Sequence, residues 1–166
     1  QYLPGNRSDL IWNDYLRPEE LPSITNPPAG FIHSANQTPF HVTSAGGNPD
    51  PSNYPVESGW PTRITNRTLR GIELMETDSA VSLEDLVAIK HDNSYSQRYR
   101  GYQYLQDIVL LEPETKIEKK ALEILGEWDL RTNKSNKGAA LGVCILSAEW
   151  RSERASTLPP DPRETL

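Results

Sequence analysis

Proline is concentrated in one part of this chain, and that distribution limits what the chain can fold into. Ten of the 14 prolines lie within the first 61 residues. Because proline fixes φ and lacks a backbone N–H, it cannot continue an α-helix or a central β-strand. We therefore expect residues 1–62 to form short strands and long loops. Residues 63–155 have helix-like spacing of apolar residues, and residues 156–166 read as a polar tail.

The first third contains one segment that is suited to a strand. Phe31 and Ile32 follow the turn residues 26–30, and residues 43–61 form a long irregular stretch rich in glycine, asparagine and proline. Long loops of this kind often line ligand sites. The sequence therefore predicts an α+β fold, with strands and loops in the first third and helices afterwards. The first 62 residues have too few apolar positions to close a sheet by themselves.

Five segments in the remainder have helical periodicity. Ser82 is expected to cap one helix, because acidic residues follow it in the first turn. We expect Ile117 to face the core in a second helix and Cys144 to be a buried, inert thiol in the last one. The expected helices are 63–75, 83–91, 95–111, 114–128 and 139–150.

Composition excludes several classes of function. The net charge is −6 and no basic cluster is denser than Lys119–Lys120, which argues against a nucleic-acid partner. No apolar run approaches 18 residues, so we expect no membrane span. A single cysteine excludes a disulfide framework within the chain and a zinc site built on cysteines. The motifs of nucleotide-binding loops, zinc proteases and serine hydrolases are missing from the sequence.

Three segments in the first third form a recognisable series. They are WNDYLRPEELP at 12–22, NPPAGFI at 26–32 and ANQTP at 35–39. In this order and spacing they resemble the penicillin acylase family of N-terminal-nucleophile amidohydrolases, which includes the N-acyl-homoserine lactone acylases. The arginine-bearing segment 67–70, the helix start at 81–86 and the WD…S.GA pattern at 128–139 extend the resemblance over roughly residues 3–151.

The resemblance implies a partial αββα fold and a specific chemistry. Family members are precursors that cut themselves into two subunits, and the new N-terminal serine attacks an amide with its own α-amino group as base. No cofactor is required for this chemistry. By motif position, Asn36 is the asparagine that holds the oxyanion and Arg67 is the active-site arginine. Arg63 and Arg70 remain alternatives to Arg67.

The resemblance also carries expectations about what surrounds the chain. Gln1 offers no nucleophilic atom, so we expect an interior fragment of the large subunit that is inactive by itself. Its partners would be the small subunit of the same precursor and a linear N-acyl amide, either an acyl-homoserine lactone or a penicillin-type amide, in the periplasm or outside the cell. A structural calcium ion is known in the family; here Asp50 and Glu57 are the available carboxylates, and we expect both to be solvated.

Two other functions are compatible with the sequence. The chain could be a non-catalytic binding or scaffold domain, whose loops contact a partner and which folds alone. It could also be a paralogue of the acylases that kept the fold and lost the nucleophile.

Overall fold

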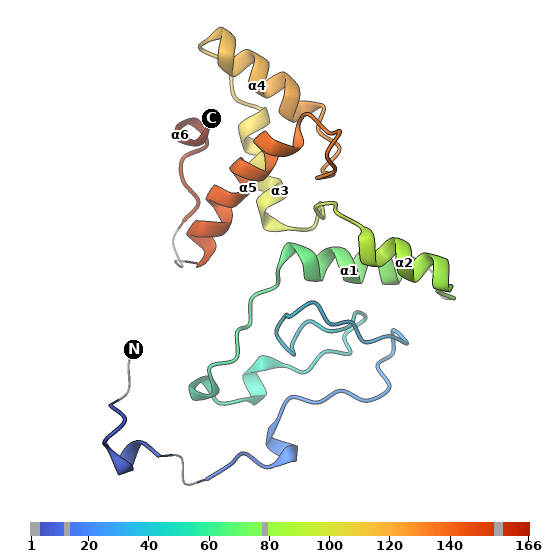
Figure 1. Ribbon diagram of the computed structural model, residues 1–166, viewed down its shortest axis with the longest axis vertical. Helices are drawn as coiled ribbons and strands as arrows, with labels where there is room; N and C mark the ends of the chain where they lie inside the picture. The colour runs from blue at the N-terminus through green and yellow to red at the C-terminus, as the bar shows by residue number, and fades with distance from the viewer. Residues whose placement is uncertain (1–3, 12–13, 78–79, 155–157) are drawn as a thin grey trace.

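A computed structural model describes residues 4–11, 14–77, 80–154 and 158–166 of the chain. Trp12, which opens the first motif, and the expected boundary at 155/156 lie outside these residues. In the described part, residues 4–65 hold only four short 3₁₀ helices, and the first α-helix begins at Asn66. The irregular segment lies below α1 in Figure 1, and the other long helices lie beside or above α1.

The expected strands are not formed. In the described residues, strand pairing is limited to one isolated antiparallel bridge between Ser94 and Arg131. The prediction of an α+β fold with strands in the first third is therefore wrong, and no αββα sheet is present in the part of the chain that the structure describes. Phe31 and Ile32 have strand propensity, but propensity reflects packing against neighbouring strands, and Ile32 is 55% exposed.

Side chains satisfy the backbone of the irregular segment in place of a strand ladder. Asn48 Oδ1 accepts the N–H groups of Val42 and Thr43 at 2.7 and 3.1 Å, and its Nδ2 donates to the carbonyl of Thr43. Thr43 Oγ1 donates to the carbonyl of Phe31 at 2.7 Å. Asparagine and threonine side chains offer the backbone these local alternatives to a sheet.

Three aromatic rings give this segment a small core of its own. Phe40 is buried, and its ring centroid lies 5.6 Å from that of Tyr54 and 6.5 Å from that of Trp60. Tyr54 and Trp60 meet edge to face at 5.6 Å. Tilted and edge-on contacts of this kind add to the burial energy of the rings. They hold the long loop against the segment that carries the motif at 35–39.

Within the described residues, six α-helices follow the irregular segment: α1 (Asn66–Glu76), α2 (Leu83–His91), α3 (Arg100–Val109), α4 (Lys116–Gly126), α5 (Ala139–Arg154) and α6 (Pro162–Thr165). Ser82 caps α2, as expected, because its side chain accepts the N–H of Asp85 while Asp85 bonds back to the N–H of Ser82. The side chains of Thr65 and Thr115 cap α1 and α4 by accepting the N–H groups of Thr68 and Glu118. Every described helix is too short or too polar to cross a bilayer.

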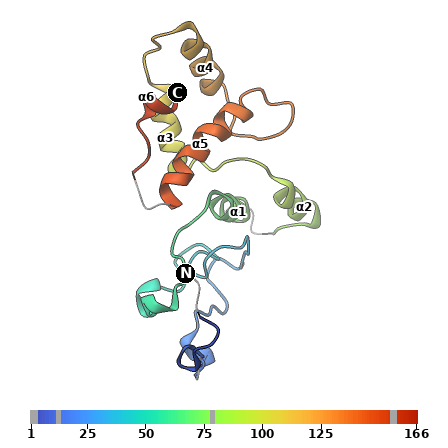
Figure 2. The same ribbon diagram turned by 60° about the vertical axis from the view of Figure 1, so that its left-hand side comes forward.

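The main core forms between α3, α4 and α5. Figure 2 shows α3 and α5 running side by side above α1, with α6 against α3. Tyr104 on α3 hydrogen-bonds Thr165 on α6 at 2.5 Å, so the polar tail packs onto the helical body. The buried members of the core are Tyr104, Leu105, Ile108, Leu125, Trp128, Leu130, Ile145 and Leu146.

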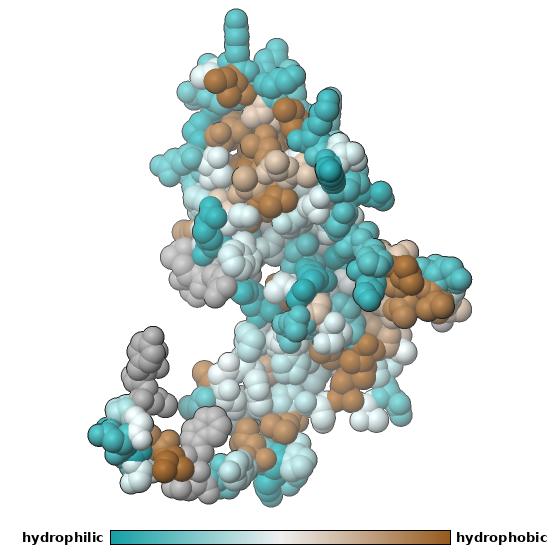
Figure 3. Space-filling view, in the orientation of Figure 1, coloured by the Kyte–Doolittle hydropathy of each residue, from teal (hydrophilic) through white to brown (hydrophobic). Residues whose placement is uncertain are grey.

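Two apolar positions, and helix α2 as a whole, are more exposed than their periodicity suggested. Ile117 is 83% exposed because it lies in the first turn of α4, before that helix reaches α3. Cys144 is exposed, since α5 turns Ile145 and Leu146 inward and leaves Cys144 on the outer face. The expectations of a core-facing Ile117 and a buried Cys144 are wrong. Helix α2 buries none of its residues, and Figure 3 shows apolar surface over it.

Candidate active site

A cleft of about 880 Å³ opens where the irregular segment meets the helices. Its walls come from residues 33–36, from α1 and α2, and from the connection at 92–95. Asn36 and Arg67, which are 31 residues apart in sequence, both line it. Their side chains are solvent-exposed at the cleft, so a molecule that entered the cleft would meet both.

Asn36 occupies a turn that few residues tolerate. Its φ is +58°, in the left-handed region, where asparagine is favoured over other non-glycine residues. Its Oδ1 accepts a hydrogen bond from Arg67 Nη2 at 3.1 Å, and Arg67 Nη2 also donates to the carbonyl of Ala35. Because a guanidinium can only donate, the atom of Asn36 that faces it must be the amide oxygen. The Nδ2 group then points away and has no partner among the described residues.

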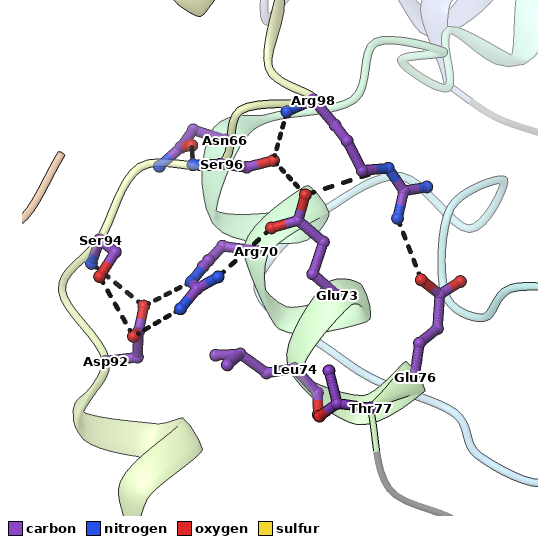
Figure 4. A network of polar contacts seen from close by, with 10 residues as sticks. All are labelled: Asn66, Arg70, Glu73, Leu74, Glu76, Thr77, Asp92, Ser94, Ser96 and Arg98. Atoms are coloured by element: carbon purple, nitrogen blue, oxygen red, sulfur yellow. Dashed lines mark hydrogen bonds and ion pairs between the residues drawn. The ribbon is translucent and has the colours of Figure 1, made fainter. Parts of the chain in front are cut away.

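The two other candidate arginines, Arg63 and Arg70, have different surroundings. Arg70 donates to both carboxylate oxygens of Asp92, at 2.9 and 3.0 Å, and lies 3.5 Å from Glu73 (Figure 4). The hydrogen bonds from Arg70 hold the pKa of Asp92 below its usual range. Arg63 precedes α1 and is exposed. Of the three candidates, Arg67 is therefore the arginine that contacts Asn36.

Comparison with known families places the chain. A model of the family described as penicillin amidase matches residues 1–162. The chain belongs to the penicillin amidase family. Membership means acylase or amidohydrolase-type chemistry, the hydrolysis of amides. The resemblance drawn from the motifs at 12–39 is thus confirmed at the level of the family.

The network of Figure 4 fixes one wall of the cleft. Ser96 donates from its backbone N–H to Asn66 Oδ1 at 2.8 Å and from its hydroxyl to Glu73 at 2.6 Å. Ser94 contributes two hydrogen bonds to Asp92. These contacts tie the connection at 92–98 to α1, so Arg70 and Asp92 form a structural pair in that wall.

Sequence reasoning missed two residues beside Asn36. His33 lines the cleft, and burial together with the charge of Arg67 lowers its pKa, although its own backbone acts against this. Gln37 bonds to several backbone groups around Asn36. The signal that could have found His33 is Gly71 in the middle of α1, because a Cβ there would lie 2.0 Å from His33 Nε2.

The two loop carboxylates lie on successive 3₁₀ turns. Asp50 Oδ1 accepts the N–H of Ser52 and so caps a 3₁₀ turn, and Glu57 is exposed on the next one. Calcium takes six to eight oxygen ligands. In the described part of the chain, no three acidic, histidine or cysteine side chains gather closely enough to hold a metal.

The WD…S.GA pattern has a packing role. Trp128 Nε1 donates to the carbonyl of Arg131 at 2.8 Å, and the indole ring lies against Gly138 and Gly142, where a Cβ would approach to 2.9 and 2.2 Å. Asp129 Oδ1 accepts from the N–H of Arg131. The pattern therefore marks the close approach of Trp128 to α5, away from the cleft.

Proposed function

We propose that this chain is part of an acylase that cleaves linear N-acyl amides of small amines, either acyl-homoserine lactones or penicillin-type amides. The nucleophile would be an N-terminal serine supplied from outside these 166 residues, and the chain would be an inactive interior part of the large subunit. The sequence pattern GF…N..PF at residues 30–40 favours the lactone acylases. The observation that carries the proposal is the donor group of Asn36, held by Arg67 at the edge of the cleft.

The chemistry follows from where charge develops. The serine oxygen attacks the carbonyl carbon of the substrate, and its proton passes to the α-amino group of the same serine. The carbonyl oxygen becomes an oxyanion, to which Asn36 Nδ2 donates. The C–N bond then breaks, the leaving amine takes the proton, and water hydrolyses the acyl-enzyme in the same sequence.

Arg67 acts on this donor in two ways. Its hydrogen bond to Oδ1 fixes which end of the carboxamide faces the substrate, so no reorganisation is needed when the oxyanion forms. Its positive charge also polarises the carboxamide and strengthens the N–H donor on the other side.

The same proposal includes the partner subunit, the compartment and the cofactor requirement of the enzyme. The partner is the small subunit cut from the same precursor, and the compartment is the periplasm or the extracellular space. The chemistry needs no cofactor, nucleic acid or membrane. The family resemblance supports these statements, and the acidic charge of −6 favours neither a nucleic acid nor an anionic lipid surface.

A substrate panel tests the function. The mature enzyme that contains this chain is incubated with N-acyl-homoserine lactones of several chain lengths and with a penicillin, and release of the free amine is measured. We expect amine release from at least one of the two classes, and loss of it when the N-terminal serine is replaced by alanine. An enzyme that leaves every amide intact yet binds one of them would favour a binding domain or an inactive paralogue.

A further inference from the structure

The loop that carries Asn36 is organised around one side chain. A backbone hydrogen bond from His33 N–H to the carbonyl of Val42, at 2.7 Å, closes the loop. Inside it, half-buried Gln37 donates from Nε2 to the carbonyls of His33 and His41, at 2.7 and 3.2 Å. Its Oε1 accepts the N–H of Ala35. One carboxamide thus bonds both arms of the loop.

These contacts fix the residue that precedes Asn36. The N–H of Ala35 is held by Gln37, and its carbonyl is held by Arg67. A left-handed φ is unfavourable for a non-glycine residue and persists only where the surroundings determine it. Asn36, at φ +58°, is exposed, so packing does not restrain it. The restraint comes from the hydrogen bonds of its neighbours.

We propose that Gln37 is a positioning residue, which holds the turn at Asn36 so that the Asn36 carboxamide lies between Arg67 and the cleft. The inference rests on the proposed oxyanion role of Asn36 and adds to it the group that sets its geometry. Gln37 itself does not line the cleft and touches no reacting atom.

His33 extends the same restraint to helix α1. Its Nδ1 lies 3.2 Å from Gln37 Nε2, so the ring contacts the carboxamide that holds the loop. Burial lowers the pKa of the His33 ring. The ring also packs on Gly71, where there is no room for a Cβ. Gln37 is thereby tied to the helix that presents Arg67.

A double-mutant cycle tests the inference in the mature enzyme. Gln37→Met keeps the length of the side chain and removes its hydrogen bonds; Asn36→Ala removes the donor. We expect Gln37→Met to lower kcat at least tenfold and to leave KM within about twofold, because the oxyanion exists only in the transition state. In the Asn36→Ala background, Gln37→Met should lower kcat no further. Gln103→Met, at an exposed glutamine on α3, is the matched control and should leave both constants unchanged.

The outcomes are separable. An unchanged kcat for Gln37→Met, or equal losses in both backgrounds, would overturn the positioning role. An unchanged kcat for Asn36→Ala would overturn the oxyanion role of Asn36 instead. If Gln37→Met does not yield mature enzyme, Gln37→Glu replaces it, since a carboxylate keeps the acceptor for Ala35 and loses the donor. The kcat of that variant should recover relative to wild type as the pH is lowered and the carboxyl gains a proton; a constant ratio would contradict the proposal.

Discussion

Replacing Arg67 with alanine should slow the enzyme without unfolding it. The hydrogen bond from Arg67 to Asn36 Oδ1 is charge-assisted, and such bonds contribute about 1.5–3 kcal/mol. Because Arg67 is exposed, we take the lower value. At about 1.4 kcal/mol for each factor of ten, kcat should fall about tenfold. The loss should stay below the roughly 2.7–4 kcal/mol expected when an oxyanion donor itself is removed.

Arg70→Ala is the matched comparison, one turn away on the same helix. Arg70 bonds Asp92, whose carboxylate is only 17% exposed. Breaking a fully buried pair costs roughly 3–5 kcal/mol, and partial exposure lowers this to about 2 kcal/mol. A loss of this size should lower the Tm of the mature enzyme measurably.

Steady-state kinetics and thermal unfolding on the same preparations separate the two arginines. We expect Arg67→Ala to keep its Tm within about 2 °C and lose turnover, whereas Arg70→Ala loses Tm. If Arg67→Ala keeps full kcat, or if it unfolds like Arg70→Ala, then the bond to Asn36 is not what Arg67 contributes.

Three further predictions concern stability. Gly142→Ala places a Cβ 2.2 Å from the ring of Trp128, so we expect the free energy of unfolding to fall by about 1–3 kcal/mol despite the better helix propensity of alanine. Gly126→Ala is the control, because its Cβ would meet its nearest neighbour at 3.8 Å, and it should not lower Tm. Equal Tm values for the two variants would refute the contact with Trp128. Ser82→Ala removes the cap of α2 at a cost of about 1 kcal/mol. Because α2 buries no residue, the loss should appear as faster amide hydrogen exchange within α2 and leave the global Tm unchanged; a fall in Tm would show that α2 supports the core. Folding lowers the pKa of His33, so the unfolded state binds the proton more tightly than the folded state. The contribution of His33 to the stability of the fold is therefore present above about pH 6.5 and is lost as the pH falls. The Tm of the wild type should therefore fall more between pH 7.5 and pH 5.5 than the Tm of His33→Gln. Equal falls in the two proteins would show that His33 does not cause the pH dependence.

The helices could be predicted because their signals are local. Ser82 caps α2 as the sequence indicated, since a capping box needs only residues three positions apart. The absence of the expected strands could not be predicted in this way, because a strand is stable only when another extended segment pairs with it. Phe31 and Ile32 have the propensity, but the Thr43 hydroxyl, rather than a partner strand, bonds the carbonyl of Phe31.

The sequence could propose residues for the candidate site but could not show which of them contact one another. Motif resemblance selected Asn36 and left three arginines open. Only the packing of α1 against the loop shows that Arg67 reaches Asn36 while Arg70 pairs with Asp92. Gln37 has no sequence signal of its own, because an amide that satisfies backbone groups looks like any polar loop residue.

The turnover number of Asn36→Ala is the measurement that tests the account most directly. With the N-terminal serine intact and the protein folded, removal of the carboxamide donor should lower kcat by about 10²–10³ and leave KM nearly unchanged. A kcat within threefold of the wild-type value would contradict the central claim that the Asn36 amide, held by Arg67, stabilises the oxyanion.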